Sequence, residues 1–198
     1  MTRNQPIDID RREALRRAAL LLGGMLSAPT IAGVLAGCES RHADATTFTP
    51  RALTEDQLEL VATMAEHILP TTDTPGARAA GVHRFIDTML AEYYPAADTQ
   101  RFVSGLADVD ARAHRLAERR FLDCSPAQQV ALLETLDREA FAMLAAAPTP
   151  FFRTLKELTL VGYYTSQPGA TQELKYLRVP GRFSGCVPFT AVGRTWSV

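Results

Sequence analysis

The stretch "TEDQLELVATMAEHILP", from Thr54 to Pro70, decides the fold class. Thr54 and Gln57 have the spacing of a capping box, which predicts that a helix starts here. The apolar residues that follow recur at helical spacing and therefore share one face of that helix, and Pro70 ends it. The residues of this face are Leu58, Val61, Ala62, Ala65, Ile68 and Leu69.

The same signals recur toward the C-terminus. Ser125, Pro126 and Gln128 predict a capped helix start, and Thr149-Pro150 repeats that start. Convincing runs of alternating apolar and polar residues, which would predict strands, are missing. The sequence therefore predicts an all-α fold with about five helices in a compact bundle. In chain order these helices are expected over 55–69, 82–93, 98–118, 126–145 and 151–164.

The last stretch, residues 166–198, has a different composition. Seven proline and glycine residues exclude a regular helix, yet the stretch is richer in large apolar residues than disordered tails usually are. We therefore expect a long irregular segment that packs across the helices or across another protein.

The N-terminal stretch has the three parts of a secretory signal. Five arginines precede or open it, no residue from Ala18 to Cys38 is charged, and small residues close it. Leu35 to Cys38 resembles a lipobox, which would make Cys38 a lipidated residue. Ordinary cleavage after Ala36 and an uncleaved anchor are the alternatives. A native amphipathic helix is disfavoured because no polar face interrupts the run. The predicted organisation is a signal over 1–38, a spacer over 39–50 and a helical domain over 51–198.

Composition excludes some classes of function. Of the 198 residues, 46% are hydrophobic and 22% are charged, which is ordinary for a globular domain. The net charge of the whole chain is −1. Residues 1–37 have a net charge of +2, so residues 38–198 have a net charge of −3. A mildly acidic body without a basic stripe does not predict nucleic-acid binding.

Motifs that hold cofactors are missing from the sequence. The three cysteines are isolated from one another, so neither haem c attachment nor an iron–sulfur cluster is predicted, and no glycine-rich nucleotide loop occurs. Glu66, His67, Asp73 and His83 form the one polar cluster of interest. A metal or acid–base role there competes with capping and surface hydrogen bonding, which we favour because sequence neighbours point in different directions around a helix. We therefore expect no catalytic, metal or cofactor site in this chain.

Two cysteines suggest a disulfide. In an exported chain, the unmatched thiols of Cys124 and Cys186 can pair, and the bond would close 62 residues. Loop-closure arguments give such a bond roughly 4 kcal/mol of stabilisation. It would attach the irregular C-terminal segment to the start of the fourth helix. The alternative is that both thiols stay free.

The basic front resembles a twin-arginine export signal, whose pattern is S/T-R-R-x-F-L-K. In the stretch from Asp10 to Arg16, both arginines of the pair and Leu15 match the pattern, whereas Asp10, Ala14 and Arg16 stand in for its hydroxyl residue, Phe and Lys. Such a signal is an address read by a receptor. The resemblance implies export of folded cargo by the twin-arginine translocase.

Two longer stretches resemble the gluconate 2-dehydrogenase subunit 3 family. They are "HILPTTDTPGARAAGVHRFID", from His67 to Asp87, and "FFRTLKELTLVGYYTSQPGATQELKYLRVPGRFSGCVPF", from Phe151 to Phe189. The middle of the chain, from Ala96 to Pro148, is similar to the family only in its helical character.

The resemblance implies a non-catalytic small subunit of a bacterial, membrane-associated sugar dehydrogenase. The implied partner is a large flavoprotein of the glucose–methanol–choline type, which holds FAD and the catalytic residues, and a multihaem cytochrome c subunit often completes the complex. The small subunit then carries the export signal for both. This places it at the periplasmic face of the inner membrane, with a lipid anchor as one option. The sugar and the electron acceptor stay open.

We expect the interface with the large subunit to involve residues 71–81 and 166–189. Aromatic and arginine anchors usually dominate such contacts. The alternative for these residues is that they only close the core of their own domain. A free-standing exported lipoprotein that binds a small ligand or another envelope partner, and an enzyme in its own right, are the rival functions. The candidate anchors are Tyr163, Tyr164, Tyr176, Arg178, Arg182, Phe183 and Trp196.

Overall fold

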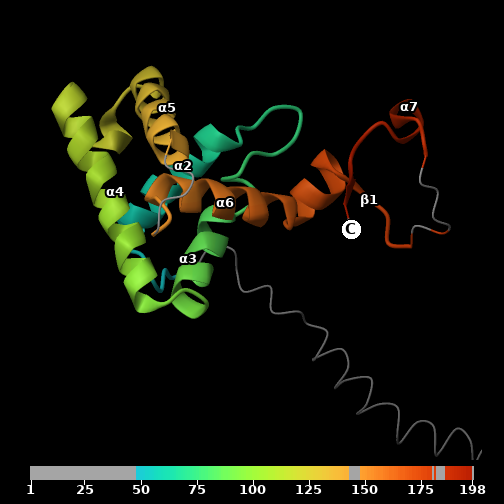
Figure 1. Ribbon diagram of the computed structural model, residues 1–198, viewed down its shortest axis with the longest axis horizontal. Coiled ribbons are helices and arrows are strands. Elements are labelled where there is room, and N and C mark those ends of the chain that lie inside the picture. Colours follow the sequence, from blue (N-terminus) through green and yellow to red (C-terminus); the bar gives the residue numbers. More distant parts are fainter. Residues whose placement is uncertain (1–47, 143–147, 180, 182–185, 198) are drawn as a thin grey trace, which may run out of the picture. The chain divides into compact units, whose positions relative to one another are not determined.

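The computed structural model describes residues 48–142, 148–179, 181 and 186–197 (Figure 1). The chain divides into two units, Met1–Phe48 and Thr49–Val198, and the second unit contains all the elements described below. Several predicted sites lie outside the described residues: the export-signal residues Arg11, Arg12 and Leu15, the lipidation candidate Cys38, and the interface candidates Arg182 and Phe183.

The fold is mostly helical, as predicted. Among the described residues, the helices longer than ten residues are α2 (Glu55–Ile68), α3 (Val82–Glu92), α4 (Ala96–Ala117), α5 (Pro126–Ala142) and α6 (Phe151–Tyr164). Within this described part of the chain, no helix combines the length and apolarity needed to cross a membrane.

Both predicted capping boxes are present. The backbone N–H of Gln57 donates to Thr54 Oγ1 at 3.2 Å, and the side chain of Gln57 accepts from the Thr54 N–H at 3.0 Å. Ser125 and Gln128 exchange the equivalent bonds at the start of α5, at 2.9 and 3.4 Å. These bonds satisfy donors that the first turn of a helix leaves without an intrahelical partner.

The start of α4 differs from the prediction, which began this helix at Asp98. Pro95 is the N-cap, and its carbonyl accepts the N–H groups of Asp98 and Thr99 at 2.9 and 3.1 Å. Asp98 therefore lies in the first turn, where its charge favours the helix dipole. The predicted end of the fourth helix near Ala145 falls outside the described residues.

Helix α6 lies at the centre of the helical body and contacts each of α2, α3, α4 and α5 (Figure 1). Its Leu155 is fully buried, together with Val61 of α2, Ile86 of α3 and Val109 of α4. A short 3₁₀ helix, η1 (Phe121–Asp123), adds the buried ring of Phe121 to this core. The apolar stripes predicted from the sequence therefore form one continuous core.

The C-terminal segment is irregular, as predicted. It contains the π-helical turn η2 (Gly169–Glu173), β1 (Lys175–Tyr176), the single turn α7 (Phe189–Val192) and β2 (Trp196–Ser197). Strands β1 and β2 pair in parallel, with Lys175 opposite Trp196. The segment continues beyond the C-terminal end of α6 and turns back on itself, rather than lying across the other helices (Figure 1).

Candidate functional site

Two segments that the sequence marks as interface candidates meet at the end of α6. They are the loop of residues 71–81 and the segment of residues 166–189, which belongs to a longer stretch, residues 166–197, called here the C-terminal arm. The hydroxyl of Tyr163, on α6, donates to the carbonyl oxygen of Pro75 at 2.8 Å. Thr74 Oγ1 donates to Glu173 Oε2 at 2.9 Å and lies 3.4 Å from Tyr163 Oη. These four residues form the loop–arm junction, which fixes the loop and the base of the arm relative to each other.

The loop itself is built around the carboxylate of Glu66, at the end of α2. Glu66 Oε1 accepts the N–H and the hydroxyl of Thr71 at 2.9 and 2.7 Å, and Oε2 accepts the N–H of Arg78 at 2.9 Å. A Cβ atom on Gly76 would overlap this carboxylate, so the close approach requires glycine. Residues 71–73 are consequently held in place while their side chains stay exposed.

The loop is expected to lose stabilisation at acid pH. Burial acts to raise the pKa of Glu66, but the hydrogen bonds from Arg78 and Thr71 outweigh it, so the pKa lies below its ordinary value of 4.5. The unfolded chain then binds more protons than the folded chain just below pH 4.5, and stability falls as the pH falls through the folded pKa. In urea unfolding, the free energy of unfolding of wild type should therefore exceed that of Glu66→Gln at pH 7, and this difference should shrink toward pH 3.

The control for this comparison is Glu134→Gln, which removes one negative charge from an exposed position on α5. A gap between wild type and Glu66→Gln that is equally large at pH 7 and pH 3 would contradict the role given to the Glu66 carboxylate.

The base of the arm is a tight turn. Ser166 Oγ donates to the carbonyl of Tyr163 at 2.6 Å and accepts the N–H of Gly169 at 3.2 Å. A side chain on Gly169 would overlap the carbonyl oxygen of Tyr163, so only glycine permits this path. The turn therefore sets the direction in which the arm leaves α6.

The arm is closed by a clasp between its two ends. The N–H of Lys175 donates to the carbonyl of Thr195 at 2.8 Å. The ammonium of Lys175 donates to the carbonyl of Val192 at 3.1 Å and lies 4.7 Å from the ring centre of Trp196. Arg194 donates to the carbonyl of Gln172. These contacts join the two ends of the arm, although most of its described residues are exposed.

The predicted interface residues differ in how far their side chains are exposed to solvent. Tyr176, Arg178 and Trp196 are exposed on the arm. Tyr164 is half-buried and packs edge-to-face on Tyr163, with ring centres 5.4 Å apart. Tyr163 has only 3% of its surface exposed in the chain alone, and its hydroxyl holds the loop. Thr74 and Glu173, which complete the junction, lie within the two predicted segments but were not named individually as candidates.

The polar cluster near the end of α2 separates into distinct environments. His67 Nε2 lies 2.7 Å from Gln129 Oε1, and Gln129 in turn donates to the carbonyl of Phe121 at 2.8 Å. Asp73 accepts the hydroxyl of Thr72 at 3.0 Å. Burial, with Arg84 and Arg78 nearby, lowers the pKa of His83. Within the described residues, no three His, Cys, Asp or Glu side chains are placed to hold a metal ion.

Both described cysteines are free thiols in this structure. Cys124 is half-buried, and its thiol donates to the carbonyl of Arg120 at 3.4 Å. Cys186 is exposed on the arm. The disulfide between them is therefore not formed here, and their pairing stays a prediction.

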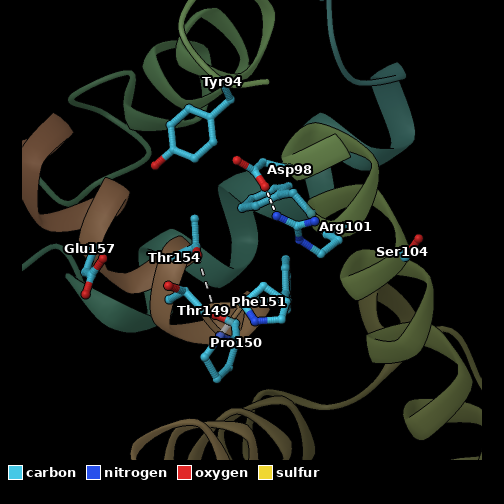
Figure 2. A pocket seen from close by; sticks show the side chains of 11 residues that line it. Tyr94, Asp98, Arg101, Ser104, Thr149, Pro150, Phe151, Thr154 and Glu157 are labelled. Carbon is cyan, nitrogen blue, oxygen red and sulfur yellow. Dashed lines mark hydrogen bonds and ion pairs between the residues drawn. The ribbon is translucent and has the colours of Figure 1, made fainter. Parts of the chain in front are cut away.

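A cavity of about 610 Å³ is lined by Tyr94, which follows α3, by the first half of α4, and by residues 148–150 with the start of α6 (Figure 2). Its charged side chains form ion pairs, Asp98 with Arg101, and Glu157 with Arg153 at 3.0 Å. The hydroxyls of Ser104 and Thr154 face backbone carbonyl oxygens at 2.9 and 3.5 Å. Neither hydroxyl is paired with a side chain that could act as a base, so these residues do not form an activated nucleophile.

These features define a small all-α domain that displays a fixed loop and a clasped arm at one end. The chain belongs to the gluconate 2-dehydrogenase subunit 3 family, whose model matches residues 55–181. The match includes α2 to α6, the 71–81 loop and the base of the arm. Membership implies that the chain is a subunit of such a dehydrogenase complex. No curated protein and no solved structure matched the chain.

Proposed function

We propose that this chain is the non-catalytic small subunit of a periplasmic, FAD-dependent sugar dehydrogenase. It binds a flavoprotein of the glucose–methanol–choline type, stabilises it and supplies its twin-arginine export signal. FAD and haem c belong to partner subunits, and the complex works at the periplasmic face of the inner membrane. A lipid on Cys38 would provide one means of anchoring it there.

One observation carries the proposal: the loop–arm junction joins two segments, both similar to family signatures, into one exposed face. Thr74 and Glu173 are 99 residues apart in the sequence, yet their side chains share a hydrogen bond of 2.9 Å. Hydrogen bonds accepted by the Glu66 carboxylate and one donated by the Tyr163 hydroxyl fix the loop beside the arm. A face whose backbone is fixed before binding loses little conformational entropy when a partner docks.

The exposed side chains of this face suit a protein interface. Apolar residues of the arm are open to solvent in the chain alone, namely Tyr176, Leu177, Val179, Val187, Phe189 and Trp196. Covering such residues is favourable by about 25 cal/mol for each Å² of apolar surface removed from water. Contact with a large subunit would remove this surface from water.

The test is a pull-down of the flavoprotein through a C-terminal tag on the full chain, followed by a flavin spectrum and a binding titration. Replacing Tyr176 and Phe189 together by alanine should weaken the complex about 100-fold or more, because buried aromatic anchors often contribute at least about 2 kcal/mol each. Circular dichroism and thermal unfolding would establish that the variant is folded.

The matched control replaces Tyr93 and Leu116 by alanine. These two residues are also highly exposed, at 69% and 72%, but they lie on the helical body away from the arm. The control should bind the flavoprotein as wild type does. Undiminished binding by the arm variant would remove the arm from the interface, and a wild-type chain that elutes as a colourless monomer would favour the free-standing lipoprotein.

A further inference from the structure

Charge is distributed unevenly along the chain. Residues 174–198 contain Lys175, Arg178, Arg182 and Arg194 but no aspartate or glutamate, a net charge of +4. Residues 49–173 contain eleven Lys and Arg against seventeen Asp and Glu, a net charge of −6. Beyond Glu173, which is bonded in the loop–arm junction, the arm is therefore basic, and the rest of the unit is acidic.

The positive charges of the arm are not neutralised in the described part of the chain. Lys175 and Arg194 donate to backbone carbonyls in the clasp, which leaves both side chains charged. Arg178 is exposed. Among the described residues, none of these three cations lies within ion-pair distance of a carboxylate.

Apolar side chains are interleaved with these cations. Val179 follows Arg178 and is 74% exposed, and Phe189 of α7 is 67% exposed. A basic arm beside an acidic body would be drawn back onto that body if it were free to move. The glycine turn at residue 169 and the clasp instead direct the arm away from it (Figure 1).

We propose that the arm docks on an acidic surface of the large subunit that contains apolar hollows, and that charge steers the association. This inference rests on the proposed function and adds the chemistry of the partner surface. An anionic bilayer is the less favourable occupant, because residues 49–173 of the same unit carry a net charge of −6. Opposite charges across an interface mainly raise the association rate and suppress wrong partners.

The experiment measures the association and dissociation rates of the full chain with the flavoprotein between about 0.01 and about 0.15 M NaCl. Over this range the screening length falls from about 30 to about 8 Å. The association rate should fall about tenfold or more, while the dissociation rate changes little. Arg178→Glu should lower the association rate at low salt and flatten its salt dependence.

The matched control is Arg138→Glu, a charge reversal at an exposed position on α5. It should leave the salt dependence as it is in wild type. An association rate that does not change with salt, for a complex that still forms, would overturn the inference and leave the proposed function standing. Failure of the complex to form at any salt concentration would instead remove the proposed function.

Two further outcomes identify a different occupant. Sedimentation of the full chain alone would reveal a salt-sensitive homodimer, which would assign the arm to a second copy. Co-sedimentation with vesicles rich in phosphatidylglycerol, lost in Arg178→Glu but not in Arg138→Glu, would assign it to the lipid surface. Either result overturns the proposal. A chain that stays monomeric and does not bind the vesicles supports the proposal.

Discussion

Replacing Asp87 by alanine is expected to lower the free energy of unfolding by about 3–5 kcal/mol, because three hydrogen bonds to one fully buried carboxylate are lost. Asp87 lies on α3 and is fully buried. Its oxygens accept the N–H groups of Arg51, Ala52 and Leu53 at 2.9, 3.0 and 2.9 Å. The carboxylate thus binds the segment through which the chain enters the helical body.

The alanine variant would leave these backbone donors without an acceptor and create a cavity beside Leu53. For a chain of this size the expected loss corresponds to a fall in melting temperature of roughly 10 °C. Asp87→Asn keeps the volume and one carbonyl oxygen, so it should cost less than the alanine variant. Thermal and urea unfolding of the variants measure both effects.

The control is Asp108→Ala, which removes an aspartate whose pair with Arg112, at 2.7 Å, lies at the surface. Exposed ion pairs usually contribute less than about 1 kcal/mol. An Asp87→Ala variant no less stable than Asp108→Ala would show that the three hydrogen bonds do not hold the segment of residues 51–53.

The helices could be predicted from local signals. The capping residues Thr54 and Ser125 are within a few positions of the groups they bond, and the apolar stripes repeat within each helix. Such interactions depend on short stretches of sequence, so the fold class and most helix boundaries could be predicted from them. The two-residue strands β1 and β2 were missed because they are too short to show an alternating pattern.

The tertiary hydrogen bonds could not be predicted. Asp87 bonds residues 34 to 36 positions away, and Thr74 bonds Glu173 across 99 positions. No local pattern specifies such partners. Tyr163 was assigned to a partner interface from its residue type, but its hydroxyl reaches the carbonyl of Pro75 inside the domain. An aromatic residue with one polar atom fits a buried junction as well as an interface.

Replacing Arg11 and Arg12 by lysine is expected to abolish export of the flavoprotein. The change keeps the charge of the basic front, so a loss of export would reflect failed recognition of the arginine pair and not weaker electrostatic attraction to the membrane. The chain itself should still fold and bind the flavoprotein in the cytoplasm. Pull-down from whole cells would establish that both subunits are made and associate.

The control replaces Arg16 and Arg17 by lysine, which makes the same chemical change a few residues away. Lysine at position 16 also brings the sequence closer to the twin-arginine pattern. This variant should export the flavoprotein as wild type does.

The central claim is that this chain carries a catalytic companion out of the cytoplasm while the companion performs the chemistry. The most direct test measures dye-linked sugar oxidation and bound flavin in the periplasmic fraction of cells that make the flavoprotein with each version of this chain. Activity and flavin should appear with wild type and with the Arg16/Arg17 control, and fall to background with the Arg11/Arg12 variant. Equal periplasmic activity with the Arg11/Arg12 variant, or with this chain deleted, would contradict the claim.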